Sequence, residues 1–283
     1  KNAREKAVPT QINTRTRVVA VGSGKGGVGK STISTNLAVG LENLGFTTGL
    51  LDADIWGYSV PRLLGIEGRL KANEEKKIIP YKKGGLEVVS TGLIADDEDT
   101  ALMWRGLMLS KALEQFLFDV AWGNLDYLVI DLPPGTGDIQ MALGRLLPQT
   151  ELLVVTTPQP SAQKVATRVA DMAKRSFIPL LGVIENMSYF ETGDKNKYKI
   201  FGEGGGDELS EKFGIPLLSK IPISETSVEE SENGIPILSQ KNESPTKNSM
   251  QDLVNEIVKI LPPISDETCT GRLAKVLEEL EAE

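Results

Sequence analysis

A glycine-rich segment near the beginning of the chain constrains the fold more than any other feature. It follows a short valine-rich run, residues 17–21, and precedes a stretch of helical character from about Lys30 to Asn43, which Gly45 is expected to end. The segment fits the pattern G-x-x-x-x-G-K-[ST] and consists of Gly24, Lys25, Gly26, Gly27, Val28, Gly29, Lys30 and Ser31. A strand, a glycine-rich turn and a helix in this order predict a phosphate-binding loop.

The residue types in this segment suit a nucleoside triphosphate together with Mg²⁺. Glycines let the backbone curl so that its N–H groups point at phosphate oxygens, and the start of the helix adds partial positive charge. Lys30 would contact the β- and γ-phosphates, and the Ser31 hydroxyl would bind Mg²⁺. An ordinary glycine turn, the alternative, would not need the complete pattern. We therefore predict binding of ATP and Mg²⁺, with Thr32 as a further nucleotide-binding residue.

Short runs rich in Val, Ile and Leu alternate along the chain with longer helical stretches. This alternation is typical of parallel strands joined by crossover helices. The runs after the first one are residues 48–51, 87–90, 127–130, 152–156, 179–184 and 217–221. They predict an α/β fold with a doubly wound, mostly parallel sheet. Residues 67–85 and 191–199 combine charged residues with glycines, and we expect exposed loops there.

Three aspartates stand where predicted strands end. Hydrolysis of ATP requires a placed Mg²⁺ ion and a placed water molecule, and carboxylates are suited to both tasks. Asp131 follows the run 127–130 and is assigned to the hydration shell of Mg²⁺. Asp54 is assigned to orient or deprotonate the attacking water, and Asp52 to support the metal. Spacing alone does not divide the roles of these two residues, and acids at strand ends can also be solvated caps.

The composition narrows the classes of function and location. With 283 residues, of which 40% are hydrophobic, the chain can form one or two domains. A net charge of -8 argues against binding of nucleic acid or of anionic lipid. One cysteine, Cys269, and no histidine exclude a disulfide or a histidine-based metal site within one chain, and indicate a reducing cytoplasm. A stretch of about 18 uncharged apolar residues, which a membrane helix needs, is absent from the sequence.

Several blocks resemble the deviant-Walker-A P-loop ATPases, the group that contains MinD, ParA, the nitrogenase iron protein and the Mrp proteins. Lys25, which precedes Lys30 in the glycine-rich segment, resembles the signature lysine of this group. Within the group the chain is most similar to the Mrp branch, the ATP-dependent iron–sulfur cluster carriers related to ApbC. The resemblance covers roughly residues 15–261, and the blocks that carry it are DADIWGYSVP (52–61), MWRG (103–106), DLPPGTGD (131–138), VIENMS (183–188) and IFGEGGG (200–206).

The resemblance implies roles for individual residues and for partners. Lys25 would cross the interface of a homodimer and contact the phosphates of the partner's nucleotide, so that it acts in catalysis with Lys30 and Asp54. Asn186 would hydrogen-bond the adenine, and residues 134–138 would form a switch that senses the γ-phosphate. The implied partners are iron–sulfur apoproteins or assembly factors.

Three parts of the chain are predicted. Residues 1–16 resemble the linker that joins an N-terminal domain to the ATPase in this family, and residues 17–261 form the ATPase domain. Residues 262–283 form a tail in which apolar positions at helical spacing, 273–280, predict a short amphipathic helix. This helix could dock on the body of the protein or on a partner.

The sequence departs from the Mrp pattern in the cysteines that ligate the iron–sulfur cluster. The family commonly carries Cys-x-x-Cys between the VIENMS and IFGEGGG blocks, and two such pairs across a dimer ligate a bridging [4Fe-4S] cluster. The corresponding residues here, 190–199, contain no cysteine. Clusters are held chiefly by thiolates, so a dimer with one cysteine per chain cannot supply four of them. The [4Fe-4S] cluster is therefore implied by resemblance alone, and Cys269 is expected to be a buried or incidental residue.

Two functions of different classes remain open from the sequence. The first is an ATPase that carries or scaffolds iron–sulfur clusters as a homodimer. The second is a MinD- or ParA-like ATPase that switches a positioning or interaction role without metal cargo. The chain ends in an acidic stretch, 278–283, which anionic lipid would repel, so the first is favoured over a MinD-like role. A metabolic kinase is a third possibility, but no feature names an acceptor substrate.

Overall fold

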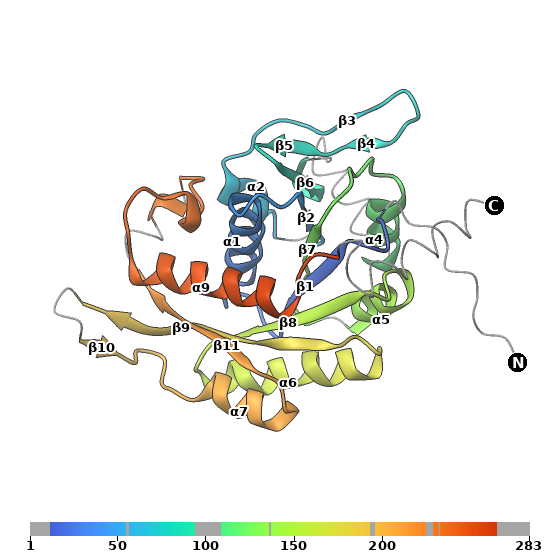
Figure 1. Cartoon of the computed structure of the whole chain (residues 1–283). Helices are drawn as coiled ribbons and strands as arrows, with labels where there is room; N and C mark the ends of the chain where they lie inside the picture. The colour runs from blue at the N-terminus through green and yellow to red at the C-terminus, as the bar shows by residue number, and fades with distance from the viewer. Residues whose placement is uncertain are drawn as a thin grey trace, which may run out of the picture.

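The glycine-rich segment connects the first strand of a twisted central sheet to the first helix of the chain (Figure 1). The computed structural model describes residues 12–54, 57–93, 109–135, 137–192, 196–224, 229–231 and 233–264. The sheet contains β1 (Arg17–Ser23), β2 (Thr48–Asp52), β5 (Tyr81–Lys83), β6 (Leu86–Ser90), β7 (Tyr127–Asp131), β8 (Thr150–Thr156), β9 (Leu180–Glu191), β10 (Lys197–Tyr198) and β11 (Leu217–Ile223). A separate small ladder pairs β3 (Lys71–Ala72) with β4 (Ile78–Ile79).

The strands follow the order β10-β9-β8-β1-β7-β2-β6-β5, and β11 pairs with β9. Pairing is parallel throughout the centre, and only the edge strands β5 and β10 are antiparallel. The connecting helices are α1 (Lys30–Asn43), α2 (Ser59–Leu64), α4 (Leu109–Phe118), α5 (Gly137–Leu146), α6 (Pro160–Arg175), α7 (Gly205–Phe213) and α9 (Pro245–Ile260), with short 3-10 turns η1 (Thr91–Leu93) and η2 (Ile237–Ser239). The predicted α/β fold with a mostly parallel sheet is confirmed.

Strand β1 shows why both faces of the sheet are covered. Its side chains alternate between two apolar clusters, with Val18 and Ala20 in one and Val19 and Val21 in the other. The first cluster is completed by α4, α5, α6 and α7, and the second by α1, α2 and α9. Figure 1 shows α6 and α7 on one side of the sheet and α1 and α9 on the other. A strand buried on both faces must be apolar throughout, which explains the valine-rich run.

The predicted strands and the helix from Lys30 to Asn43 are present, and Gly45 follows that helix with a positive φ of 91°. Both predicted loops are partly wrong. Residues 67–85 contain β3, β4 and β5: β3 pairs with β4, and β5 pairs with β6 as the edge strand of the main sheet. The segment 191–199 contains β10, which folds back on the end of β9 as an antiparallel pair. Short edge strands of this kind carry little apolar periodicity, so their sequences resemble loops.

The start and the end of the described chain both pack on the domain. Ile12 is buried, and the Thr16 hydroxyl donates a hydrogen bond to the Leu125 carbonyl at 2.8 Å. The Tyr127 hydroxyl donates to the Leu261 carbonyl at 2.8 Å, and Arg17 Nε donates to the Pro262 carbonyl at 2.8 Å. The predicted tail helix, Cys269 and the MWRG block lie outside the described residues. The three-part division of the chain stays a prediction.

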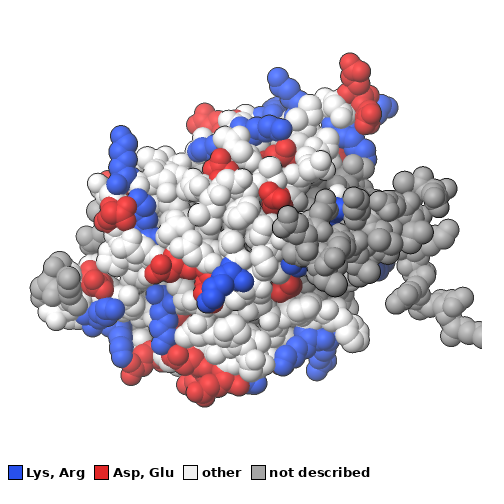
Figure 2. Space-filling view, in the orientation of Figure 1, with Lys and Arg blue, Asp and Glu red and all other residues white. Residues whose placement is uncertain are grey.

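Basic and acidic side chains are interspersed over the described part of the face shown in Figure 2. Within the part of the chain that the structure describes, helices long and apolar enough to cross a membrane are absent.

Candidate functional site

The site forms where three neighbouring strands end at the same edge of the sheet. Strands β1, β7 and β2 lie side by side in parallel, and their register places Asp131 opposite both Val21 and Asp52. The segment 24–31, called the phosphate loop from here on, leaves β1 at this edge. Ligands of open α/β sheets bind beyond the carboxyl ends of the strands, so topology alone brings the loop and the predicted carboxylates together.

Glycines of the phosphate loop allow close contacts that a side chain would prevent. A Cβ atom at Gly24 would lie 2.3 Å from the backbone carbon of Val165 in α6, so the loop rests directly on that helix. Gly29 has a φ of 80°, and a Cβ there would lie 2.2 Å from Asn186 Nδ2. Gly29 caps α1 without a side-chain hydrogen bond to the first turn, which leaves N–H groups of that turn available to an anion.

Lys30, Ser31 and Asp131 form a buried polar cluster beneath the loop. Lys30 Nζ lies 2.7 Å from Asp131 Oδ1, and the Ser31 hydroxyl donates to Asp131 Oδ2 at 2.6 Å. Ser34, one turn further along α1, donates its hydroxyl to Asp131 Oδ1 at 2.7 Å. Asp131 is fully buried, so its charge depends on these donors. The lysine and hydroxyl predicted for phosphate and metal thus meet the predicted metal-binding carboxylate.

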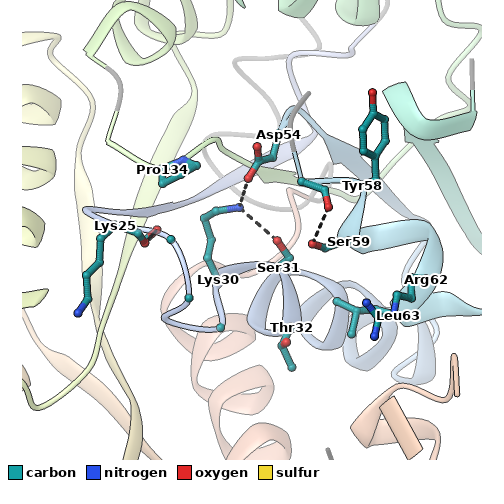
Figure 3. A pocket seen from close by; sticks show the side chains of 15 residues that line it. Lys25, Lys30, Ser31, Thr32, Asp54, Tyr58, Ser59, Arg62, Leu63 and Pro134 are labelled. Atoms are coloured by element: carbon teal, nitrogen blue, oxygen red, sulfur yellow. Dashed lines mark hydrogen bonds and ion pairs between the residues drawn. The ribbon is translucent and has the colours of Figure 1, made fainter. Parts of the chain in front are cut away.

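Asp54 and Asp52 have different surroundings. Asp54 Oδ2 lies 3.6 Å from Lys30 Nζ, and the side chain faces the cavity described below (Figure 3). Asp52 is buried, accepts hydrogen bonds from the Ser90 hydroxyl at 2.8 Å and from the Asp54 amide at 3.1 Å, and does not line that cavity. Burial, followed by the nearby Asp131 carboxylate, raises the pKa of Asp52 to about 7. The Asp52 carboxylate therefore fixes the backbone at Asp54 through this hydrogen bond.

A cavity of about 380 Å³ opens over the phosphate loop. Its floor is made by loop residues with Lys30 and Ser31, and Asp54 and Pro134 face it from the ends of β2 and β7 (Figure 3). The opposite wall is formed by α2 and the residues before it: Gly57, Tyr58, Ser59, Arg62 and Leu63. The floor is cationic and rich in N–H donors, which suits a chain of phosphates.

A second, more apolar cavity of about 300 Å³ adjoins the first. The two cavities share the lining residues Gly29, Thr32 and Leu63, so they lie side by side. The walls of the second cavity also come from Asn186, Met187, Phe201, Pro222, Ile223, Ser224, Ser231, Ile237, Thr246 and Met250. Asn186 Nδ2 donates to the Val28 carbonyl at 2.9 Å, which fixes the orientation of the amide.

Lys25 points away from Lys30 and Asp54 (Figure 3). Its ammonium group donates to Gln159 Oε1 at 3.1 Å and lies 3.4 Å from the Ser161 hydroxyl, at the start of α6. The structure thus separates the two lysines of the phosphate loop: Lys30 lies under the cavity beside Asp131, and Lys25 lines its edge with the ammonium group turned toward α6.

The structure brings the predicted residues Asp54 and Asn186 to the walls of the two cavities and buries Asp131 beneath Lys30, whereas most other wall residues were not predicted. The block 52–61 could have pointed to three of these wall residues, because it contains Tyr58 and is followed directly by Arg62 and Leu63. The apolar cavity gave no local signal, because its walls come from segments far apart in the chain.

The family described as ParA: NUBPL iron-transfer P-loop NTPase matches residues 14–258. An iron–sulfur cluster carrier protein of Aquifex aeolicus is 50% identical over 223 residues, which are 78% of this chain and 61% of that relative. The carrier protein of Bacillus subtilis is 46% identical over 208 residues, 73% of this chain and 58% of the relative. The chain thus spans about three fifths of the length of these curated relatives.

Solved structures show the same fold. A nucleotide-binding protein from Archaeoglobus fulgidus in complex with ADP is 34% identical, has a TM-score of 0.67, and the match covers 82% of this chain and 90% of that one. The septum site-determining protein MinD of Pyrococcus horikoshii, at 23% identity and a TM-score of 0.68, shows the fold alone; that match covers 87% of this chain and 98% of that one. By the match over residues 14–258, the chain belongs to the NUBPL iron-transfer P-loop NTPase family.

Proposed function

We propose that the chain binds and hydrolyses Mg·ATP, with the triphosphate in the cavity over the phosphate loop and the base in the apolar cavity beside it. The observation that carries this proposal is that the two cavities adjoin each other at Gly29, Thr32 and Leu63. One cavity has a cationic floor, and the other has apolar walls with a few polar groups. This is the division that a nucleoside triphosphate requires.

The donors at the phosphate loop fit Mg²⁺. The Ser31 hydroxyl and the carboxylates of Asp131 and Asp52 are hard oxygen donors, the kind that Mg²⁺ prefers. Among the described residues no group of three or more acidic, cysteine or histidine side chains could hold a metal ion by itself. Ser31, substrate phosphates and water would hold the cation, and Asp131 and Asp52 would support it through its hydration shell. When bound, Mg²⁺ neutralises charge on the phosphate oxygens.

Lys30 and Asp54 are assigned to the reaction itself. Lys30 is paired with Asp131, and phosphate oxygens would offer its ammonium group a second set of anionic partners. Asp54 faces the cavity and is held through its amide by Asp52. We assign Asp54 to orient or deprotonate the water that attacks the γ-phosphate.

Asn186 supports adenine as the base. One of its two Nδ2 hydrogens donates to the Val28 carbonyl, which fixes the amide plane, and its Oδ1 can accept from a ligand. The exocyclic amine of adenine donates a hydrogen bond, whereas guanine carries a carbonyl at that position. The fixed amide therefore favours ATP over GTP.

Lys25 is assigned to the nucleotide of a second copy of the chain, in a homodimer that couples hydrolysis to association. Its ammonium group lies at the edge of the cavity, turned away from Lys30 and bound to Gln159 and Ser161, and Lys30 already supplies the cation beneath the cavity. Mixing inactive Lys25→Ala and Lys30→Ala chains should restore part of the hydrolysis. If no mixture recovers activity at any ratio, the assignment in trans loses its support.

The rate of ATP hydrolysis, which we expect to be slow, tests the enzymatic part of the proposal. With Mg²⁺, Asp54→Ala should bind ATP within about threefold of wild type but hydrolyse it about a hundredfold more slowly. Asp171→Ala, which removes an exposed aspartate of α6, is the matched control and should behave as wild type. Equal hydrolysis by wild type and Asp54→Ala would remove Asp54 from this role.

The wider role that we propose is that of an ATP-dependent carrier or scaffold for iron–sulfur clusters, serving apoproteins or assembly factors. The relatives named as carriers, 50% and 46% identical, support it. A second candidate, a nucleotide-switched interaction ATPase without metal cargo, is favoured by one observation. The chain has one cysteine and no histidine, so a dimer cannot ligate a [4Fe-4S] cluster through four of its own thiolates.

A further inference from the structure

The apolar cavity contains a buried hydroxyl group without a hydrogen-bond partner. Ser231 is 6% exposed, and its Oγ takes part in no hydrogen bond within the described part of the chain. Buried polar groups in native proteins are nearly always paired, because an unpaired one loses its hydration without compensation. Ser231 lines the cavity, and its Oγ is itself buried, so a rotation about χ1 would turn this unpaired hydroxyl toward a partner that enters the cavity.

The position of Ser231 is fixed by its backbone. Its carbonyl accepts from the Gly234 amide at 3.1 Å, within a turn closed by a second bond from Ile235 N to the Glu230 carbonyl at 3.0 Å. Gly234 packs so closely on Gly65, at the end of α2, that a Cβ there would lie 2.5 Å from the Gly65 Cα. Ser231 thus belongs to a turn that packs on the end of α2, the helix that forms a wall of the neighbouring phosphate cavity.

Two other polar side chains of this cavity donate to carbonyl groups of the protein. The Thr246 hydroxyl donates to the Pro222 carbonyl at 3.1 Å, and Asn186 donates to the Val28 carbonyl. A purine offers flat apolar faces to the walls and ring nitrogens that accept hydrogen bonds at its edge. Resting on the nucleotide binding proposed above, we infer that Ser231 is a base-recognition residue whose hydroxyl donates to a ring nitrogen of the adenine.

If Ser231 has this role, one substitution should weaken ATP binding without lowering the stability of the ligand-free protein. Ser231→Ala removes an unpaired hydroxyl from the nucleotide-free protein, so the melting temperature without ligand should stay equal or rise. The same variant loses a hydrogen bond to the base, so the Kd for ATP should rise about three- to tenfold. A merely structural serine would not weaken binding while leaving the ligand-free protein as stable as before.

Ser176 provides a matched control, because its Oγ is also buried without a partner among the described residues and it lies at the end of α6, outside both cavities. Ser176→Ala should leave the Kd for ATP unchanged. Titrations with 1-deaza-, 3-deaza- and 7-deaza-ATP locate the contact, because each replaces one ring nitrogen with CH. For one of the three analogues, wild type and Ser231→Ala should bind equally.

The outcomes separate this inference from the proposal it rests on. If wild type binds ATP and Ser231→Ala binds it equally well, base recognition by Ser231 is wrong while nucleotide binding stands. An equal loss in Ser176→Ala, or a difference between wild type and Ser231→Ala that persists with all three analogues, also overturns it. If wild type does not bind ATP, the proposed function itself fails.

Discussion

Lys30 Nζ lies 2.7 Å from Asp131 Oδ1 in a setting where Lys30 is 6% exposed and Asp131 is fully buried. Each of two buried charges offsets the cost of removing the other from water, so the loss of one leaves the other buried without a counter-charge. The phosphate loop is therefore held to the end of β7 by the same lysine that is assigned to the nucleotide.

Removing this lysine should destabilise the nucleotide-free protein. Lys30→Ala leaves the Asp131 carboxylate buried with only hydroxyl donors, so the free energy of unfolding in urea should fall by about 3 kcal/mol. Lys25→Ala is the control, because Lys25 contacts only the neutral side chains of Gln159 and Ser161, and its unfolding free energy should change by less than about 1 kcal/mol. Equal stability of the two variants would show that the ion pair does not anchor the loop.

Two glycines of the phosphate loop should differ sharply in their tolerance of alanine. A Cβ at Gly24 would overlap the backbone of α6, whereas a Cβ at Gly26 would meet nothing within 4 Å. Gly24→Ala should therefore lower the free energy of unfolding by about 2 kcal/mol or more, and Gly26→Ala by less than about 1 kcal/mol. Thermal and urea unfolding without nucleotide measure both. Similar stabilities would mean that the loop does not rest on α6.

The end of the described chain should be anchored by Tyr127. Tyr127→Phe removes the hydrogen bond to the Leu261 carbonyl and should cost about 1 kcal/mol of unfolding free energy at neutral pH. Burial raises the pKa of Tyr127 from 10.0 to about 12. Between these values the unfolded chain loses a proton that the folded chain keeps, so deprotonation favours unfolding. The advantage of wild type over Tyr127→Phe should thus shrink as pH rises from 10 to 12, and a constant difference would contradict this pairing.

Much of the fold and site could be predicted from the sequence, because strong local signals coincide with the topology. Val18 to Val21 are apolar on both faces, and the loop pattern follows them directly, so the first strand and helix were placed correctly. The strand-end position of Asp131 sufficed to bring it to the loop, since parallel strands end at one edge.

The remaining features depend on contacts that a linear sequence does not show. Strand β10 exists because Lys197 and Tyr198 pair with the end of β9, not because of their own propensity. Asp52 and Asp54 read alike in sequence, but one is buried against Ser90 and the other faces the cavity. The partner of Lys25 on α6 and the unpaired hydroxyl of Ser231 arise from segments more than a hundred residues away from the loop.

Reconstitution with iron and sulfide should show whether this chain holds a cluster. Because the chain has one cysteine and no histidine, anaerobic reconstitution should yield little bound iron after gel filtration and no stable absorption near about 400 nm. Cys269→Ser should give the same result as wild type. Stoichiometric iron and sulfide that survive gel filtration in wild type and vanish in Cys269→Ser would make that cysteine a cargo ligand.

Equilibrium titration with ATP in the presence of Mg²⁺ tests the central claim. This claim is that the two adjoining cavities form one nucleotide site on the phosphate loop. Wild type should bind one ATP per chain, more tightly than GTP, and Lys30→Ala should bind ATP about ten- to a hundredfold more weakly because it loses a charge-assisted contact with the phosphates. Absence of saturable ATP binding by the wild-type chain, or an unchanged affinity in Lys30→Ala, would contradict the account.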